Sequence, residues 1–458
     1  MLLFLASFAH AGGYYFADVG VRSFSRGGAF IAGADDLTAM YYNPAALIRV
    51  DTGQVTLNLA GVDQAIWFDR LDYEGEAADG SDLITDPIIN AAPAYVIPHL
   101  EVAHTFGLKD TTFAFGFNPP YAPDLSYPAD GPQRYSLIDT VIIQTITGPS
   151  VAHQINPWLS VGLGASWNVL YVQQELKVTL STNLDQELEN RDVGFEVQAT
   201  DLGSLGFNGG LLIEPPEGKW AVGAMVIPPI KFDAEGEMVA NFAGNFYYED
   251  LPVLLNEISK DEDITVKVTM PLIVKTGALV RPTEAIEIEA AFVWEGWSSL
   301  DDLVVTDLDM LLETQENSFG IEDVVITDDV VLPLGYINVW SVRLGGQVDI
   351  GDRGVVRLGG LYETSAIPDE SLSPAGVDSN KVGLGFGGTF GITDNLELDA
   401  GVFRGFYQRR EIRNSEVTQI AVDPLTGDVV DGRVIGDGDY EASLLIAGGG
   451  LNWRFGGS

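Results

Sequence analysis

The chain has 458 residues, no cysteine and a formal charge of −42, which comes from 66 acidic and 24 basic residues. The lack of cysteine excludes disulfides, thiol catalysis and cysteine-ligated metals, and the acidic excess argues against nucleic acid or another polyanion as a partner. Hydrophobic residues make up 46% of the chain and its 52 glycines indicate many turns, yet no apolar run after the first dozen residues is long enough for a membrane-spanning helix.

The first eleven residues are predicted to be a signal peptide. Residues 2–9 form a short apolar stretch, and Ala9-His10-Ala11 matches the small-x-small pattern of a cleavage site. We therefore expect a secreted or envelope protein whose mature chain begins near Gly12. The alternative is a buried N-terminal strand.

The mature chain opens with a segment, up to residue 50, that lacks the alternation of a strand. Asn43 suits the N-cap of a short helix that begins at Pro44 and continues through Ala45 to Leu47. Asp35 or Asp36 is expected to cap an earlier turn in the same way. These residues either serve only as caps or belong to a gate.

The rest of the chain, from about residue 52 to 455, alternates apolar and polar residues in segments separated by Gly, Pro, Asp and Asn. In residues 284–297, Ile288 and Phe292 fall on one face, and Glu287 and Glu289 on the other. A soluble β-sandwich also alternates. A membrane barrel is favoured because the strands are long, charges recur on the polar face, and aromatic residues gather near strand ends.

We predict about fourteen antiparallel strands, an even number that suits a bacterial barrel. The short links between them are assigned to periplasmic turns, and the long acidic links (179–201, 241–263, 299–336, 366–379 and 411–440) to extracellular loops. There the negative charge would meet divalent cations and lipopolysaccharide. The strands are expected to start near residues 52, 92, 111, 134, 157, 202, 218, 264, 283, 337, 353, 380, 394 and 441.

The last predicted strand, "SLLIAGGGLNWRF", has the form of the closing strand of an outer-membrane barrel. Leu451, Trp453 and Phe455 share one face, and Asn452 and Arg454 lie on the other. An apolar outward face that ends in an aromatic residue is what such barrels present to the barrel assembly machinery. We therefore expect that machinery as a partner.

Two regions together resemble the FadL/TodX/OmpP1 family of outer-membrane transporters. The first carries Arg26-Gly27-Gly28-Ala29, Ala34-Asp35-Asp36 and Tyr42-Asn43-Pro44-Ala45-Ala46-Leu47. The second, residues 113–170, has the order of a third strand, a Pro-rich break, Arg-Tyr, a fourth strand, a short turn and a fifth strand with Gly-x-Gly.

The resemblance implies an all-β fold: a fourteen-stranded transmembrane barrel over residues 51–458, plugged by a small helical hatch over residues 12–50. Family members carry long-chain fatty acids or other hydrophobic compounds across the outer membrane. The ligand is captured among extracellular loops, moves to a pocket near the N-terminus, and leaves sideways at a kink in the third strand. By resemblance, Gly12, Tyr14, Tyr15 and Phe16 contact that interior pocket.

The Pro-rich break "FGFNPPYAP" is the candidate lateral opening. Pro119 and Pro120 donate no ladder hydrogen bond, so strand pairing is expected to fail around them. Within a bilayer, such unpaired backbone must face a cavity or a plug. The alternative is a Pro-rich loop just past the end of the strand. The residues assigned to the opening are Phe115, Phe117, Asn118, Pro119, Pro120 and Tyr121.

The link over residues 241–260 is unusually apolar for an extracellular loop. It either captures an apolar ligand, through Phe242, Phe246, Leu251, Leu254 and Leu255, or packs on other loops. Several basic residues could hold a ligand carboxylate, or instead form ion pairs inside the barrel with Glu287 or Glu289. These basic residues are Arg134, Lys267, Lys275, Arg343 and Arg357.

The sequence therefore predicts a monomeric outer-membrane transporter of long-chain fatty acids or similar hydrophobic ligands, working by passive, gated diffusion. It has no HExxH, GxSxG or P-loop motif, so we expect no enzyme, cofactor or metal. The same barrel could instead carry monoaromatic hydrocarbons or other small apolar compounds. A surface or adhesive β-protein and an outer-membrane hydrolase are the alternatives from other classes.

Overall fold

The computed structural model describes residues 19–71, 73–76, 82–83, 86–181, 187–251, 253–300, 302–314, 324–326, 330–423, 429–430 and 432–456. The expected signal peptide and the four expected pocket residues Gly12, Tyr14, Tyr15 and Phe16 lie outside these residues.

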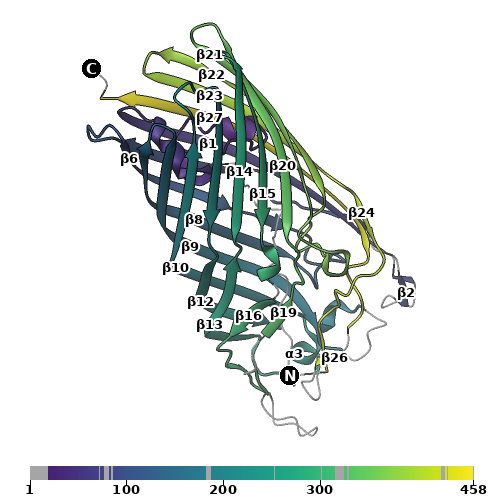
Figure 1. Cartoon of the computed structure of the whole chain (residues 1–458). Coiled ribbons are helices and arrows are strands. Elements are labelled where there is room, and N and C mark those ends of the chain that lie inside the picture. Colours follow the sequence, from purple (N-terminus) through teal and green to yellow (C-terminus); the bar gives the residue numbers. More distant parts are fainter. Residues whose placement is uncertain are drawn as a thin grey trace.

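The described residues form a closed barrel of 14 antiparallel strands, as the alternation predicts (Figure 1). Each wall strand corresponds to one predicted start, although the strand predicted from about residue 202 begins at Asp192, within the predicted 179–201 loop. In chain order the wall is built from β1 (Gly53–Arg70), β5 (Tyr95–His104), β6 (Thr111–Tyr121), β8 (Asp139–Asn156), β9 (Leu159–Thr179), β10 (Asp192–Ile213), β11 (Trp220–Ile227) with β12 (Ile230–Asn241), β13 (Ile258–Met270) with β14 (Ile273–Thr283), β15 (Ile286–Glu295), β20 (Val339–Ile350), β21 (Gly354–Glu363), β22 (Lys381–Thr393), β23 (Leu396–Tyr407) and β27 (Gly438–Phe455).

The first and last strands close the barrel. β1 pairs with β27 along its whole length, from Gly53 opposite Phe455 to Arg70 opposite Gly438. Two other wall strands are interrupted: Pro228 and Pro229 separate β11 from β12, and Pro271 separates β13 from β14. Proline cannot donate a ladder hydrogen bond, which explains these breaks.

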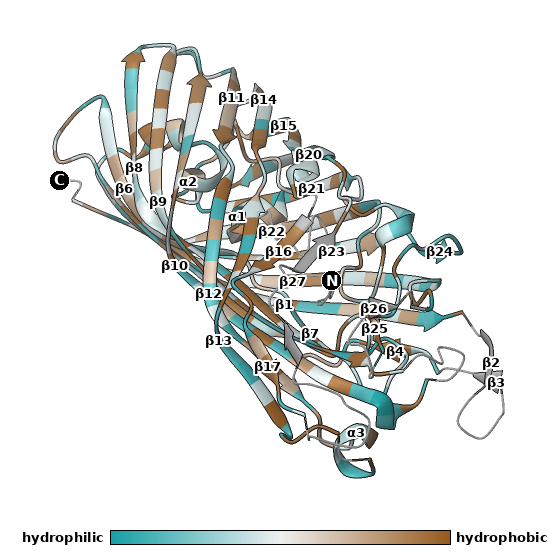
Figure 2. Ribbon diagram, turned by 90° about the horizontal axis from the view of Figure 1, so that it is seen from below, coloured by the Kyte–Doolittle hydropathy of each residue, from teal (hydrophilic) through white to brown (hydrophobic). Residues whose placement is uncertain are grey.

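The two faces of the wall differ as expected for a membrane barrel. On β15, Glu287 and Glu289 are buried inside, whereas Ile288 and Phe292 are exposed on the outer surface. Figure 2 shows brown and teal residues alternating along the wall strands around the enclosed helices. An apolar outer face with charges inside suits a barrel in lipid, because a sandwich would bury the apolar face instead.

The long links and the strand ends next to them form a packed layer at one end of the barrel. Buried side chains from the wall, such as Phe68, Leu176 and Phe232, join link residues such as Trp297 and Leu372 in one hydrophobic cluster. No helix among the described residues is long and apolar enough to span a membrane. The shorter elements are β2 (Tyr73–Glu76), β3 (Asp82–Leu83), β4 (Ile88–Ile89), β7 (Asp124–Ser126), η2 (Glu189–Arg191), α3 (Phe246–Glu249), η3 (Trp297–Ser299), β16 (Asp302–Thr306), β17 (Met310–Leu312), β18 (Val324–Ile326), β19 (Val330–Pro333), η4 (Asp369–Ser371), β24 (Arg410–Ile412), β25 (Ala421–Val422) and β26 (Val429–Val430).

Residues 19–50, called here the N-terminal segment, lie inside the barrel toward the end that carries the C-terminus (purple in Figure 1). They form α1 (Val21–Ser25), α2 (Ala39–Tyr42) and η1 (Pro44–Arg49). Helix α1 contacts β21, β22 and β23, and η1 contacts β8, β9 and β10 on another part of the wall. The segment therefore reaches across the lumen.

Several glycines within the wall strands make room for this segment. A Cβ on Gly385 of β22 would overlap the carbonyl oxygen of Phe24, and one on Gly345 or Gly359 would overlap that of Arg26. The sequence reading assigned glycine mainly to turns. These strand glycines instead allow the helices to approach the wall backbone.

Candidate functional site

Glu289 of β15 binds a bend of the N-terminal segment. Its carboxylate accepts hydrogen bonds from three consecutive backbone N–H groups, those of Ile31 (2.7 Å), Ala32 (2.8 Å) and Gly33 (2.9 Å). The Arg26 guanidinium donates to the same carboxylate at 3.1 Å and to Glu287 at 2.7 Å. Because Arg26 and Glu289 are fully buried, this group of charge-assisted bonds holds the segment strongly to β15.

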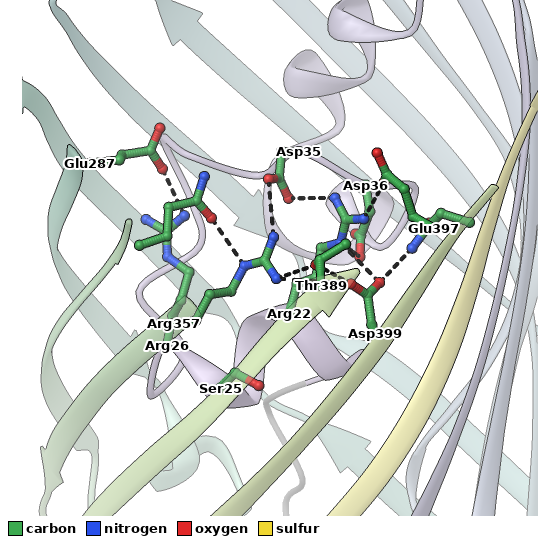
Figure 3. Close-up of polar contacts among 12 residues, drawn as sticks. Arg22, Ser25, Arg26, Asp35, Asp36, Glu287, Arg357, Thr389, Glu397 and Asp399 are labelled. Carbon is green, nitrogen blue, oxygen red and sulfur yellow. Dashed lines mark hydrogen bonds and ion pairs between the residues drawn. The ribbon is translucent and has the colours of Figure 1, made fainter. Parts of the chain in front are cut away.

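A second buried ion group holds helix α1 to β23 (Figure 3). Arg22 donates through Nε to Asp399 at 3.0 Å and through Nη2 to Glu397 at 2.6 Å. Its Nη1 also lies 3.3 Å from Asp35, whose other oxygen lies 3.7 Å from Arg357 of β21. The sequence motif Arg26-Gly27-Gly28-Ala29 drew attention to this region, but Arg22 and Asp399 were not expected as partners.

The two acids predicted as caps have different roles. Asp36 accepts hydrogen bonds from the backbone N–H (2.9 Å) and the hydroxyl (2.5 Å) of Thr38, so it caps the turn before α2. Asp35 instead joins the ion group around Arg22. Burial raises the pKa of Asp36 to about 6, with Arg22 lowering it and Asp35 raising it. Burial also raises the pKa of Asp35, but Arg22, Arg357 and Arg26 outweigh this effect and lower the pKa below its ordinary range.

Asn43 has the predicted position at the start of η1. Its Oδ1 accepts from the backbone N–H of Ala45 at 3.1 Å, and Pro44 is the first residue of the helix. The Asn43 amide also donates to the carbonyl of Leu211 on β10 at 2.8 Å. Asn43 is therefore both a cap and a link between the segment and the wall.

The wall is incompletely paired between β5 and β6. The ladder runs from His104 opposite Phe113 to Leu100 opposite Phe117 and stops there, whereas the ladder of β5 with β1 continues to Tyr95 opposite Val62. On the other side of β6, the register with β8 shifts between Asn118 and Tyr121. Pro119 and Pro120 lie at this shift, inside strand β6 as the structure has it.

The predicted residues of the opening do not share one face. Phe115 is 50% exposed on the outer surface, Phe117 is half-buried, and Asn118, Pro119 and Pro120 are buried. The side chain of Tyr121 lies outside the described part of the structure.

A small apolar cavity of about 60 Å³ lies on the inner side of this break. Tyr41 and Val19 line it from the N-terminal segment, and Asn118 and Pro120 line it from β6. Lys275 of β14 also lines it, donating to the Tyr41 carbonyl at 3.1 Å, with its Nζ 4.9 Å from the centre of the Tyr42 ring. The cavity thus connects the segment to the break. Tyr41 was not singled out from the sequence, because no local pattern marks a residue that meets its partners across the lumen.

The apolar link after β12 is divided between packing and exposure. Phe242 is only 2% exposed and belongs to the hydrophobic cluster, with Leu254 packed against it. Phe246, in α3, lies under the Arg191 guanidinium at 3.8 Å. Leu251 and Leu255 are 39% and 52% exposed. Of the five residues predicted for ligand capture, only Leu251 and Leu255 are exposed.

The predicted ion pairs of the five basic residues with Glu287 or Glu289 are wrong. Among the described residues, Glu287 and Glu289 pair with Arg26 and Arg281. The reason is that Arg26 arrives from the N-terminal segment, which no strand register predicts. The basic residues have other surroundings: Arg134 pairs with Asp192, Arg343 with Glu363, Arg357 with Asp35 and Asp399, Lys275 bonds the Tyr41 carbonyl, and Lys267 is exposed.

No group of three or more His, Asp or Glu side chains among the described residues is arranged to hold a metal ion. The polar groups described above hold the segment to the wall, and the cavity beside the break is apolar with a few polar atoms. Such an arrangement suits binding and passage of an apolar molecule.

Comparison with known proteins identifies a family match over most of the chain. Residues 2–454 match the family described as outer membrane protein transport protein (OMPP1/FadL/TodX). A relative from Neisseria meningitidis serogroup B, named as an outer membrane protein, is 25% identical over 138 residues, or 29% of this chain. The match spans only 28% of the length of that curated relative.

Solved structures share the fold over nearly the whole chain. A FadL homologue from Pseudomonas aeruginosa has a TM-score of 0.77 at 17% identity, with 97% of this chain and 100% of that chain covered. The toluene transporter TodX of Pseudomonas putida has a TM-score of 0.66 at 15% identity, with coverage of 99% and 100%. At these identities the likeness concerns the fold alone.

Proposed function

Since the chain belongs to the OMPP1/FadL/TodX family of outer-membrane transporters of hydrophobic compounds, we propose that its cargo leaves the barrel sideways, through the break between β5 and β6. Transport of this kind is passive diffusion, driven by the cargo gradient and the partition of the cargo into lipid. The chain's acids and bases then act in binding and in holding the N-terminal segment.

The observation that carries this proposal is the position of the cavity beside the break. The backbone ladder between β5 and β6 ends at Leu100 and Phe117, and Asn118 and Pro120, just beyond that end, line the cavity. Unpaired backbone within a bilayer is tolerated only where it meets protein or a cavity. An apolar molecule in the cavity therefore has a short route to the outer surface near Phe115.

The other steps of the route follow from the same geometry. Leu251 and Leu255 form the first apolar contact for a molecule that arrives from outside the cell. The N-terminal segment acts as a hatch, because it lines the cavity through Val19 and Tyr41 and is held to the wall at Glu289. Movement of this hatch would admit cargo that is larger than the cavity.

Long-chain fatty acids are the first cargo to test, and the cavity lining includes the cationic side chain of Lys275. A small monoaromatic compound is the second candidate, because the cavity volume of about 60 Å³ suits a short molecule better than an extended acyl chain.

The test is a reversible lock across the break. His99 and Asn118 face one another, with Nδ1 donating to Oδ1 at 2.6 Å, and the chain has no other cysteine to interfere. We expect the pair His99→Cys with Asn118→Cys, once oxidised, to block uptake of labelled oleate and toluene by intact cells, and a reductant to restore it.

The matched control is a lock within the paired part of the same two strands. Ala103 lies opposite Ala114 in the ladder, so Ala103→Cys with Ala114→Cys joins strands that are already closed. Uptake through this control should not respond to oxidation. Undiminished uptake through the oxidised 99–118 pair would overturn the lateral route.

A further inference from the structure

Four polar side chains that line the cavity each carry one buried atom without a hydrogen-bond partner among the described residues. These atoms are the Tyr41 hydroxyl, Asn118 Nδ2, Gln144 Oε1 and Asn208 Oδ1. A buried polar atom left unsatisfied is costly, so such atoms are rare in folded proteins. Four of them around one cavity indicate that something else completes their bonding.

The orientation of the three amides is set by their other atoms. His99 Nδ1 donates to Asn118 Oδ1 at 2.6 Å, which leaves the Asn118 Nδ2 group as a donor. Gln144 Nε2 donates to Asn168 Oδ1 and Asn208 Nδ2 donates to the Met40 carbonyl, both at 3.4 Å, which leaves two amide oxygens as acceptors. With the Tyr41 hydroxyl as a second donor, the cavity offers donors and acceptors together.

The groups beside the cavity offer little to hold an anionic ligand. Glu101 of β5 is fully buried, and both its carboxyl oxygens lack a hydrogen-bond partner among the described residues. It adjoins Tyr41: a Cβ on Gly116 would lie 2.9 Å from the Tyr41 hydroxyl and 3.1 Å from Glu101 Cγ. Lys275 supplies one positive charge, but its Nζ already bonds the Tyr41 carbonyl and faces the Tyr42 ring.

We propose that the cavity is a binding subsite for an uncharged hydroxyl group on a hydrophobic molecule. The hydroxyl donates to Gln144 or Asn208 and accepts from Tyr41 or Asn118, while the apolar body contacts Ile146, Met225 and their neighbours. This inference rests on the proposed transport function and narrows its cargo to alcohols, phenols and fatty acids in their un-ionised form.

A matched set of small aromatic compounds tests the subsite. In p-cresol a hydroxyl stands where p-xylene has a methyl group, and 4-methylbenzoate carries an ionised carboxylate at neutral pH. We expect the detergent-solubilised protein to bind p-cresol about tenfold more tightly than p-xylene, as one to two satisfied hydrogen bonds imply, and to bind 4-methylbenzoate most weakly. Equilibrium dialysis with labelled compounds measures all three.

The variant Asn118→Leu with Gln144→Met removes one donor and one acceptor at nearly constant volume. It should lose most of the preference for p-cresol while it keeps its affinity for p-xylene. Gln154→Met is the control, because Gln154 lies on the same strand and face as Gln144 but does not line the cavity. A comparison of 1-hexadecanol with p-cresol then distinguishes long-chain from aromatic carriers of the hydroxyl, and hexadecanoate tests the effect of the charge.

The possible outcomes separate this inference from the transport proposal. Equal binding of p-cresol and p-xylene, or a preference that survives in the double variant, would show that only water occupies the polar atoms and would overturn the subsite. If both compounds still enter cells at equal rates, transport itself stands. Failure of every compound, oleate included, to enter cells would instead refute the transport function.

Discussion

Arg26 of the N-terminal segment donates to Glu289 of wall strand β15 at 3.1 Å inside the barrel.

 The pair is fully buried, and Glu289 also accepts the N–H groups of Ile31, Ala32 and Gly33. One wall carboxylate therefore accepts hydrogen bonds from three consecutive backbone N–H groups in a bend of the segment. Its loss should release that bend from β15.

Glu289→Gln tests this role. An amide of nearly the same size carries no charge for Arg26 and presents a donor to N–H groups that need an acceptor. We expect docking of the segment to weaken by about 3 kcal/mol, the usual cost of breaking a buried pair. The reporter is Ser23→Cys, whose side chain is buried in α1 and reacts with a thiol reagent only when the segment leaves the wall.

The control for this variant is Glu262→Gln, which removes an exposed carboxylate that pairs with Lys260 at 3.1 Å on β13. It should leave the labelling rate of Ser23→Cys unchanged. Equal labelling of the two variants would show that Glu289 does not hold the segment.

Gly385→Ala tests the close approach of α1 to the wall. A Cβ at this position would overlap the carbonyl oxygen of Phe24, so the helix must shift, at a cost of about 2 kcal/mol. Gly391→Ala, on the same strand and face, places its Cβ 3.5 Å from Arg353, an ordinary contact. Faster Ser23→Cys labelling is expected for the first variant alone. If Gly391→Ala has the same effect, the wall strand and not the contact with α1 is responsible.

The architecture could be predicted from the sequence because it follows from local patterns. Period-two alternation, as in Glu287 and Glu289 against Ile288 and Phe292, marks each wall strand wherever one face meets lipid and the other the lumen. The cap at Asn43 and Pro44 was also predictable, since a cap depends on residues that are close in the chain.

The contacts of the site could not be predicted in this way because they join distant positions. Glu289 receives its partners from residues 26–33, and Arg22 reaches Asp399 across the lumen. Such pairs depend on the path of the segment through the barrel, which alternation does not encode. The unsatisfied atoms of Asn118 and Gln144 likewise become visible only when their other bonds are known.

Pro119→Ala with Pro120→Ala tests whether the break needs its prolines. Alanine supplies the missing N–H groups, so the ladder between β5 and β6 can extend past Leu100 and Phe117. Uptake should fall well below that of the wild type, while heat-modifiable migration on gels shows that the barrel still assembles. Pro149→Ala, in the paired part of β8 opposite Phe115, is the control and should transport normally. Normal uptake by the double variant would mean that the route does not depend on the break.

Leu251→Ser with Leu255→Ser tests capture by the apolar link. Both leucines are exposed, so their replacement should not affect folding. It should weaken ligand binding, because burying one leucine side chain against a ligand contributes about 1.5 kcal/mol or more to the binding free energy. We expect the apparent KM for uptake to rise while the maximal rate stays constant. Leu108→Ser removes an exposed leucine from the short turn between β5 and β6 and should change neither value. A fall in maximal rate without a change in KM would argue against capture at this link.

Asp36 should make docking of the N-terminal segment depend on pH. Its pKa is raised to about 6 by burial, from the ordinary value of 3.8, and it returns to that value when the segment is released into water. The docked state therefore binds the proton more tightly. Its extra stability is fully present below the released-state pKa and is lost as the pH rises through about 6.

Labelling of Ser23→Cys should accordingly become faster between about pH 4 and pH 7. The increase should be at most about a hundredfold, which is the factor that corresponds to a shift of two pKa units. Rates are divided by those of an exposed reporter, Gln198→Cys, because thiol reactivity itself changes with pH. Asp36→Asn, which keeps the bonds to Thr38 but cannot ionise, should remove the slope and label slowly throughout. A slope that persists in Asp36→Asn would assign the pH dependence to another group, and Glu397, which is bonded to Arg22 and partly exposed, is the next to replace.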